Sequence, residues 1–354
     1  MSAQGGPAGG RRPVDRLARR LPAPGPPGPV PPVTGPHVSA GRPDVVGVGE
    51  AMVLLEADDL AAAARFDASV AGAELNVCTA VARLGLRAAF ASRVGPDPFG
   101  TRVLREAEAR GVDTGLVITD PGRPTGVFFK EIRPDSGRRV HYYRAGSAAS
   151  AMDVPDAGAI LARRPRALVV SGLTAALGPG PARLVAALCE QAGDALVVLD
   201  PNLRPALPAP DLAPLLPRVG LLVLGQDESR VLFGESDPAR VFAAARAAGV
   251  GEVVLKGGPE GAWYAGDAGP EHVPTAAREV RDPVGAGDAF LGGYLAARLS
   301  GAGPGAATRL GAELAGRVVA TSGDTAGLPD PATAHALLRH ALTDGLTDEG
   351  RGQR

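Results

Sequence analysis

The stretch DPVGAGDAFLGGYLAARLS, residues 282–300, joins a glycine-rich turn to a carboxylate at the start of an expected helix. Gly285 and Gly287 let the backbone turn tightly and leave no side chains over the amides, so those N–H groups can point at one small ligand. The helix that follows adds the partial positive charge of its N-terminus, which favours an anion. The stretch therefore predicts an anion site with Asp288 beside it.

A phosphoryl group in transfer suits this site, because its charge spreads over its outer oxygens and fixed N–H donors stabilise it. The predicted catalytic donors are the amides around Gly285, Ala286 and Gly287. Asp288 would accept the proton of an attacking hydroxyl, although a carboxylate with an ordinary pKa of about 3.9 is a weak base at pH 7. Asp in the first turn of a helix is often only a cap, so this fragment alone leaves both roles open.

Two other phosphate-binding patterns are incomplete or absent in the sequence. It contains no GxxxxGK[ST] loop, and GVGEAM (residues 47–52) begins like a dinucleotide fingerprint but has Met52 in place of the third glycine. These departures disfavour a nicotinamide-dependent oxidoreductase.

Short apolar runs alternate with helical patterns from Asp44 onward. The expected strands are VVGVG (45–49), AAFASRVG (88–95), ALVVSG (167–172), ALVVLD (195–200), LLVLG (221–225) and EVVLKGG (252–258). Between most of them lie patterns such as AELNVCTAVARLG and PARLVAALCEQAG, each ending on a glycine as a helix C-cap does. Continuous apolar strands alternating with helices predict a doubly wound α/β fold around a mostly parallel sheet.

Two segments, residues 56–72 and 124–146, lack a buried-strand run. The second contains two expected strands around a PDSGR turn, with aromatic and charged residues in alternation. We expect both segments to form a small β-sheet lid that projects from the core, an ordinary edge hairpin being the alternative. The body then spans residues 44–345, and a polar tail follows at 346–354.

The first 43 residues differ from this body in composition. They are rich in Pro, Gly and Arg, and six arginines against one acid give them a net charge of +5. This composition predicts a disordered tail. Because the whole chain has a formal charge of −1, the remainder carries −6. An acidic body argues against a nucleic-acid partner.

Membrane and metal classes are disfavoured as well. No apolar run approaches the length of a membrane span, and the twin arginine at residues 11–12 has no apolar region behind it as an export signal would. The two cysteines, Cys78 and Cys189, lie far apart without a CxxC pattern or nearby histidine cluster. A disulfide scaffold or zinc site is therefore not expected. We expect a reducing, cytoplasmic location.

Two stretches together resemble the signature regions of the ribokinase-like (PfkB) carbohydrate kinases. They are AGAELNVCTAVARLGLRAAFASRVGPDPFG (71–100) and DPVGAGD (282–288), and the resemblance extends over roughly residues 45–340. The family's second signature reads D-T-x-G-A-G-D, so Pro283 here replaces the threonine. The resemblance implies an enzyme that uses ATP and Mg²⁺. Lid sheets in this family often form dimer contacts, which implies a homo-oligomer.

The resemblance also implies a nucleotide site. KGGPEGAWY (256–264) is similar to the glycine-bearing turn that packs along the nucleotide in this family. The nucleotide-binding residues implied are Asn202, Lys256, Gly258, Gly261, Gly285 and Gly287, of which Asn202 could instead face the substrate. A simple hairpin turn is the alternative for KGGPEGAWY.

A magnesium contact is implied by GQDE (225–228), which resembles the family's N-x-x-E motif. Gly225 replaces the asparagine, so only Glu228 carries over. Glu228 would hold a hydrated Mg²⁺ through water, since this ion keeps much of its hydration shell.

The substrate is suggested by HYYRAGSAAS (141–150) and DPNLRPAL (200–207), which resemble the 2-keto-3-deoxygluconate kinases within the family. The implied reaction converts that sugar acid to its 6-phosphate. Arg144 and Arg204 would bind the substrate carboxylate, because arginine offers planar, paired donors. Each could instead be a solvated surface charge. A fructokinase or another neutral-sugar kinase, and a catalytically silent sugar-acid sensor, are the alternatives.

Further substrate contacts follow from the same resemblance. The implied residues are Gly72, Asn76, Tyr142 and the base Asp288. Two positions depart from the family pattern. Ala71 stands where the first of two glycines is usual, and Phe128 stands where a tyrosine is often found, which removes a substrate hydrogen bond worth about 0.5–1.5 kcal/mol.

Overall fold

The computed structural model describes residues 41–133, 137–266 and 269–349. Most of the expected N-terminal tail, the first three residues of the PDSGR turn and most of the expected C-terminal tail therefore lie outside the described residues. A compact unit spans Val33–Arg354, and the description below concerns that unit. Among the described helices, none has the length and apolar character that a bilayer crossing requires.

A nine-stranded sheet forms the centre of this unit, in the order β13-β12-β11-β10-β9-β8-β1-β4-β5. The strands are β1 (Val45–Val48), β4 (Ala88–Val94), β5 (Asp113–Thr119), β8 (Ala167–Ser171), β9 (Leu196–Asp200), β10 (Leu221–Gly225), β11 (Glu252–Lys256), β12 (Ala262–Gly266) and β13 (Gly269–Val273). They pair in parallel from β5 to β11, whereas β12 and β13 are antiparallel. The mostly parallel sheet expected from the sequence is confirmed.

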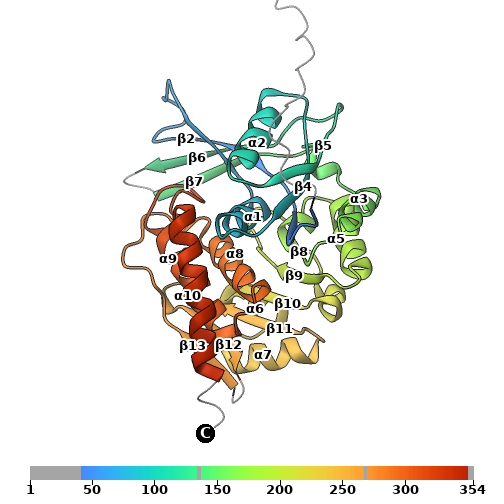
Figure 1. Ribbon diagram of the computed structural model, residues 1–354. Coiled ribbons are helices and arrows are strands. Elements are labelled where there is room, and N and C mark those ends of the chain that lie inside the picture. Colours follow the sequence, from blue (N-terminus) through green and yellow to red (C-terminus); the bar gives the residue numbers. More distant parts are fainter. Residues whose placement is uncertain (1–40, 134–136, 267–268, 350–354) are drawn as a thin grey trace, which may run out of the picture. The chain divides into compact units, whose positions relative to one another are not determined.

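Helices cover both faces of the large sheet (Figure 1). They are α1 (Ala73–Arg83), α2 (Pro98–Ala109), α3 (Ala157–Ala162), α4 (Gly172–Ala175), α5 (Pro179–Gln191), α6 (Gln226–Phe233), α7 (Pro238–Ala247), α8 (Ala286–Leu299), α9 (Pro304–Val319) and α10 (Pro331–Glu349). Short 3₁₀ helices are η1 (Ala149–Ala151), η2 (Val154–Asp156), η3 (Ala213–Arg218) and η4 (Gly258–Glu260).

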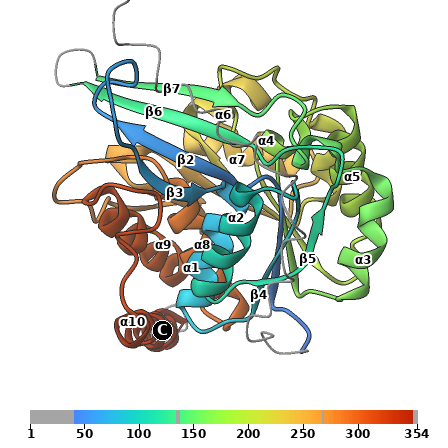
Figure 2. The same ribbon diagram turned by 90° about the horizontal axis from the view of Figure 1, so that it is seen from above.

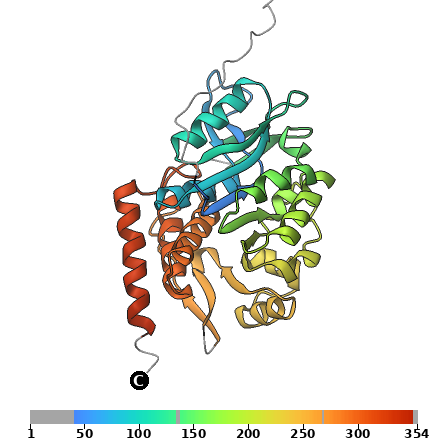
Figure 3. The ribbon, with the colours of Figure 1, turned by 45° about the vertical axis from the view of Figure 1, so that its right-hand side comes forward.

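Two apolar clusters, one on each face of the sheet, form the core. Successive residues of a buried strand point to opposite faces, so Val45 joins the cluster with α1, α8 and α9, while Val46 joins the cluster with α3, α5 and α7. Figure 3 shows α10 running along the outside of the α8–α9 pair.

A separate four-stranded sheet has the order β3-β2-β6-β7. Its strands are β2 (Met52–Ala57), β3 (Asp67–Ala71), β6 (Val127–Arg133) and β7 (Gly137–Tyr143). Figure 2 shows these strands stacked beside one another, away from the large sheet. The small sheet expected from the sequence is confirmed, but β2 was not anticipated as one of its strands. Only Gly49–Ala51 separate it from β1, so no turn signal marks its start.

Candidate active site

The DPVGAGD stretch runs into the first turn of α8, which begins at Ala286, so Asp288 lies at the start of a helix as the sequence predicts. Gly285 is the N-cap of this helix with φ +80°, in the left-handed region that favours glycine. A Cβ atom at this position would lie 2.2 Å from the backbone oxygen of Asp324, so the turn also requires a close approach of two chain segments. Among the described residues, the amides of Gly287 and Asp288 donate to no protein acceptor. They form a pair of donors at the helix N-terminus, as an anion site needs.

Asp288 lies in the first turn of α8 and is buried, with 8% of its surface exposed. The side-chain amide of Asn76, on α1, donates to Asp288 Oδ2 at 2.9 Å and to Asp324 Oδ2 at 3.2 Å. Asn76 was predicted to contact substrate, and the structure places its side-chain amide against the predicted base. Its Oδ1 atom is buried and makes no hydrogen bond within the described residues.

The pKa of Asp288 is far from the ordinary value assumed from the sequence. Burial, followed by the charges of Asp200 and Asp324, raises it to about 7, against the opposing effects of the Asn76 hydrogen bond and the Arg204 charge. A carboxylate with this pKa is a much better proton acceptor near neutral pH than an exposed one. The environment of Asp288 therefore suits a general base.

This pKa gives a testable pH dependence. We expect kcat/KM to fall as the pH drops below about 7, because Asp288 then takes up a proton and can no longer accept one from the substrate. An initial-rate profile from pH 5 to 9 measures this. The exposed carboxylate Asp227 offers a control, since Asp227→Asn should leave the profile unchanged. A profile that is flat between pH 5.5 and 8 would contradict the assignment of Asp288.

The same pKa also affects stability, with a definite sign. Between the ordinary value of 3.8 and about 7, the folded chain holds a proton on Asp288 that the unfolded chain has released. Asp288 therefore lowers the free energy of unfolding as the pH rises through this interval. At pH 8 we expect Asp288→Asn to raise the denaturant midpoint relative to the wild type.

Lys256 brings a cation next to the turn. Its Nζ atom pairs with Asp200 Oδ2 at 2.8 Å, and a Cβ atom at Gly287 would lie 3.4 Å from it. Burial opposes the charge on Lys256, but Asp200, Glu228 and Asp288 outweigh it and raise its pKa. The amide donors and a charged ammonium group thus face the same position, which suits the oxygens of a phosphoryl group.

Glu228 lies at the start of α6, close enough to Asp200 and Lys256 for their charges to act on it. Its Oε2 accepts from the Gly225 amide at 2.6 Å and its Oε1 from the Leu203 amide at 3.0 Å. Burial, then the charge of Asp200, raises the pKa of Glu228. Within the described residues no set of three or more His, Cys, Asp or Glu could hold a metal ion directly. The donor set therefore fits an ion bound mainly by phosphates and water, with a carboxylate in its outer shell.

The predicted substrate residues of the small sheet lie close together. Arg144, just after β7, forms an ion pair with Glu50 at 2.5 Å, and both side chains are largely buried. Its guanidinium carbon also lies 5.5 Å from the centroid of the Tyr142 ring. Tyr142 stacks on Phe128, with ring centroids 5.5 Å apart. Arg144 is therefore not the solvated surface charge that the sequence left open.

Gly72 lies between Glu50, which pairs with Arg144, and the helix whose Asn76 contacts the predicted base. It is the N-cap of α1, the helix that carries Asn76, and a Cβ atom there would lie 2.5 Å from the backbone oxygen of Glu50. The partner of Arg144 and the helix that contacts Asp288 are thus in direct contact at Gly72.

The remaining predicted residues follow β9 and β11. Asn202 has a left-handed backbone with φ +43°, and its backbone N–H donates to Asp200 Oδ1 at 3.1 Å. Arg204 is exposed, yet its charge acts on Asp288, which places it near the base. Gly258 begins η4 and Gly261 directly follows it, in the turn between β11 and β12. Both lie in the loop that follows Lys256, and within the described residues no hydrogen bond joins them to Asp288.

Comparison with known proteins decides the family. The pfkB family of carbohydrate kinases matches the chain over residues 42–331. The chain belongs to the pfkB family.

Relatives of this pfkB kinase include two proteins named 2-dehydro-3-deoxygluconokinase. The one from Thermoproteus tenax is 36% identical over 308 residues, covering 83% of this chain and 94% of that protein. The one from Bacillus subtilis is 31% identical over 300 residues, covering 81% and 92%. A solved structure of a PfkB protein from Polaromonas sp. JS666 has 37% identity and a TM-score of 0.74, covering 83% of this chain and 99% of that one. The chain is therefore a carbohydrate kinase.

Three acidic residues of this kinase site were not found by sequence reasoning: Glu50, Asp200 and Asp324. Asp200 had a usable signal, because it directly ends the apolar run ALVVLD, where parallel strands present their site residues. Glu50 and Asp324 lie in irregular segments, and their contacts with Arg144 and Asn76 span 94 and 248 residues of sequence. No local pattern indicates such contacts.

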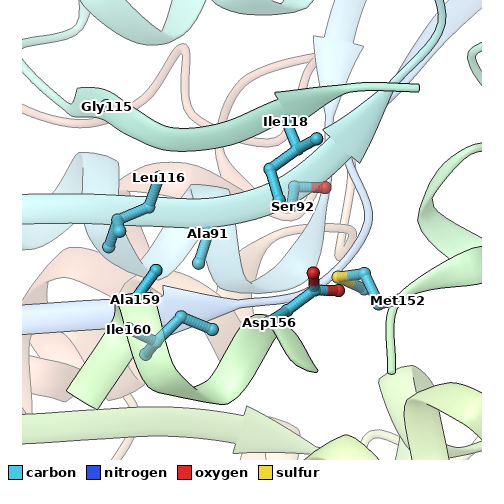
Figure 4. A pocket seen from close by; sticks show the side chains of 9 residues that line it. All are labelled: Ala91, Ser92, Gly115, Leu116, Ile118, Met152, Asp156, Ala159 and Ile160. Atoms are coloured by element: carbon cyan, nitrogen blue, oxygen red, sulfur yellow. The ribbon is translucent and has the colours of Figure 1, made fainter. Parts of the chain in front are cut away.

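A cavity elsewhere in the kinase is separate from this site. It measures about 80 Å³ and lies between β4, β5 and α3 (Figure 4). Its lining is mostly apolar, with Leu116 and Met152, and includes Ser92, whose buried hydroxyl makes no hydrogen bond within the described residues. None of the predicted site residues lines it.

Proposed function

We propose that this kinase transfers the γ-phosphoryl group of ATP to the terminal hydroxyl of 2-keto-3-deoxygluconate, giving the 6-phosphate. The observation that carries the chemistry is Asp288, which is buried, has a pKa of about 7 and lies beside the amides at the start of α8. The assignment of the substrate depends on two further points. Relatives carrying that activity in their names match over four-fifths of this chain, and we assign Arg144 and Arg204 to the substrate carboxylate.

In the proposed reaction, the substrate oxygen forms a bond to the γ-phosphorus as the bond to ADP breaks. Asp288 accepts the hydroxyl proton, and the pKa raised by burial makes this transfer favourable near pH 7. The amides of Gly287 and Asp288, together with the Lys256 ammonium group, stabilise the transferring phosphoryl oxygens. Asn76 holds the carboxylate of Asp288 in a fixed orientation through its 2.9 Å hydrogen bond.

A bound Mg²⁺ would neutralise charge on the nucleotide phosphates. Glu228 is the residue of this chain that we assign to its hydration shell. The carboxylate keeps lone pairs for water even while it accepts the amides of Gly225 and Leu203.

Recognition of the sugar acid is assigned to the two arginines. Arg144 is held by Glu50 through Nη2, and its buried Nε makes no hydrogen bond within the described residues, so part of its donor set is left for a ligand. Arg204 lies in the loop after β9, close enough to Asp288 for their charges to interact. A carboxylate between them would accept charge-assisted hydrogen bonds.

Arg204→Leu tests the substrate assignment against the fructokinase alternative. Loss of a hydrogen bond to a charged group lowers binding by about 1.5–3 kcal/mol, so we expect kcat/KM for the sugar acid to fall roughly 10- to 100-fold. Turnover of fructose, if measurable, should fall less, because it loses only the effect of the Arg204 charge on the pKa of Asp288. Arg246→Leu, at an exposed position of α7, serves as the matched control. Equal losses on the acid and on fructose would remove the basis for a sugar-acid substrate.

Two other properties belong to the same proposal. A homo-oligomer would form through the small sheet, where Phe129 contacts both Phe66 and Tyr143 edge to face and Tyr143 is 68% exposed. Light scattering on the purified chain measures the oligomeric state. A cytoplasmic location agrees with Cys78 and Cys189, which are both buried and free.

A further inference from the structure

A buried lysine joins the small sheet to the phosphate-binding turn. Lys130 lies on β6 and is 3% exposed. Its Nζ atom contacts Asp282 Oδ2 at 2.6 Å and Glu56 Oε2, on the neighbouring strand β2, at 3.1 Å. Burial opposes its charge, but the two carboxylates outweigh this effect and raise the pKa of Lys130. The ammonium group is therefore charged and fixed between the two structural parts.

Asp282 carries this connection into the turn. It is 1% exposed, and its Oδ1 atom accepts the amide of Val284 at 3.0 Å. The backbone amides of Arg281 and Asp282 donate to the Val319 oxygen at 2.7 and 3.1 Å. The start of the turn is thus held by α9 through its backbone and by the small sheet through its side chain.

The far end of the turn is close to the same charge. Gly285 packs against the backbone of Asp324, and the pKa of Asp324, although raised by burial, is lowered in part by the charge of Lys130. Only two residues lie between Asp282 and Gly285 along the chain, so a shift of Asp282 must be absorbed within the turn that presents the Gly287 and Asp288 amides.

Lys130 also shares a face of the small sheet with the predicted substrate residues. Phe128 pairs with Tyr142 and Lys130 pairs with Val140 in the β6–β7 ladder. Because side chains alternate along a strand, Phe128, Tyr142 and Lys130 point to the same side. A ligand held by Tyr142 and Arg144 therefore contacts the surface that also holds Asp282.

We infer that Lys130 is a positioning residue. Because it binds both Asp282 and Glu56, it links the position of the small sheet to the conformation of the turn that holds the transferring phosphoryl group. This inference rests on the proposed function for the reaction concerned. A displacement of reacting groups by about 1 Å can lower a rate by roughly 100-fold, so a single contact at this point has a large effect on kcat.

Lys130→Met is the first test. We expect kcat on the sugar acid to fall by about 100-fold while the Kd for ADP, measured by calorimetry, stays close to the wild-type value. Lys130→Arg keeps the charge and should restore most of the lost kcat. Arg163→Met is the matched control, because it removes an ion pair to Asp113 of 2.7 Å at the β5–α3 contact and should leave kcat unchanged.

A second variant separates positioning from folding. Lys130→Met removes a cation that contacts the buried Asp282, which can unfold the chain. The double variant Lys130→Met/Asp282→Asn removes both charges and keeps an acceptor for Val284. If the inference is right, this variant melts near the wild-type temperature and still has the low kcat. Recovery of wild-type kcat in a folded double variant would overturn the inference.

A third readout does not depend on the substrate. Hydrogen exchange followed by mass spectrometry should show faster exchange at residues 283–289 in the double variant, and no change there in Arg163→Met. Should the wild type phosphorylate no sugar acid, the proposed function fails, but this comparison still decides the role of Lys130. Unchanged exchange at residues 283–289 in the double variant would overturn that role.

Discussion

Replacing Asp288 by Asn should lower kcat by about 10²- to 10⁴-fold, the contribution that a general base makes. The variant keeps the size of the side chain and can still accept the hydrogen bond from Asn76, but it cannot take up the substrate proton. The Kd for ADP should therefore change little. Initial rates of ADP release give kcat, and calorimetric titration gives the Kd for ADP.

Asp227→Asn is the control for this substitution, since the Asp227 side chain is 98% exposed and forms an ion pair with Arg230 on the same helix. It should retain full activity. A loss smaller than about tenfold in Asp288→Asn would show that proton transfer to this carboxylate is not needed in the rate-limiting step.

Gly285→Ala should cause the second large loss, about 10²- to 10³-fold in kcat, as removal of anion-stabilising donors does. The added Cβ atom would lie 2.2 Å from the Asp324 oxygen, so either the turn or the Asp324 segment must move. A movement of the turn takes the Gly287 and Asp288 amides away from the phosphoryl group. Steady-state kinetics at saturating ATP measure the effect.

Gly301→Ala provides the matched control at the other end of the same helix. Gly301 has φ +98° and no atom within 4 Å of an added Cβ, so alanine there suffers the left-handed strain of about 1–2 kcal/mol without a steric conflict. Both variants should therefore melt at a lower temperature, and only Gly285→Ala should lose kcat. Equal kinetic losses in the two would mean that kcat follows stability rather than the turn.

Local patterns account for what the sequence could predict. The buried strands β1, β4, β8, β9, β10 and β11 are continuous apolar runs, and each lies within about two residues of its expected position. The start of α8 at Ala286 follows from the glycines around it. The edge strands β5 and β13, and β12 next to β13, were missed, because their residues are partly exposed and lack such runs.

Properties that depend on residues far apart in the sequence could not be predicted from local patterns. The pKa of Asp288 is set by burial and by Asp200 and Asp324, which no spacing rule connects to it. The contact of Lys130 with Asp282 joins residues 152 positions apart. Sequence reasoning placed Arg144 in the site, but it could not show that Glu50 already holds one side of its guanidinium group.

The most direct test of the proposed sugar-acid kinase is ADP release by the wild-type chain with ATP, Mg²⁺ and one of three acceptors: 2-keto-3-deoxygluconate, fructose or ribose. We predict strong turnover on the sugar acid alone, with a product that mass spectrometry identifies as its monophosphate. Turnover on fructose or ribose with none on the sugar acid would contradict the assignment of Arg144 and Arg204 and would leave a kinase for a neutral sugar.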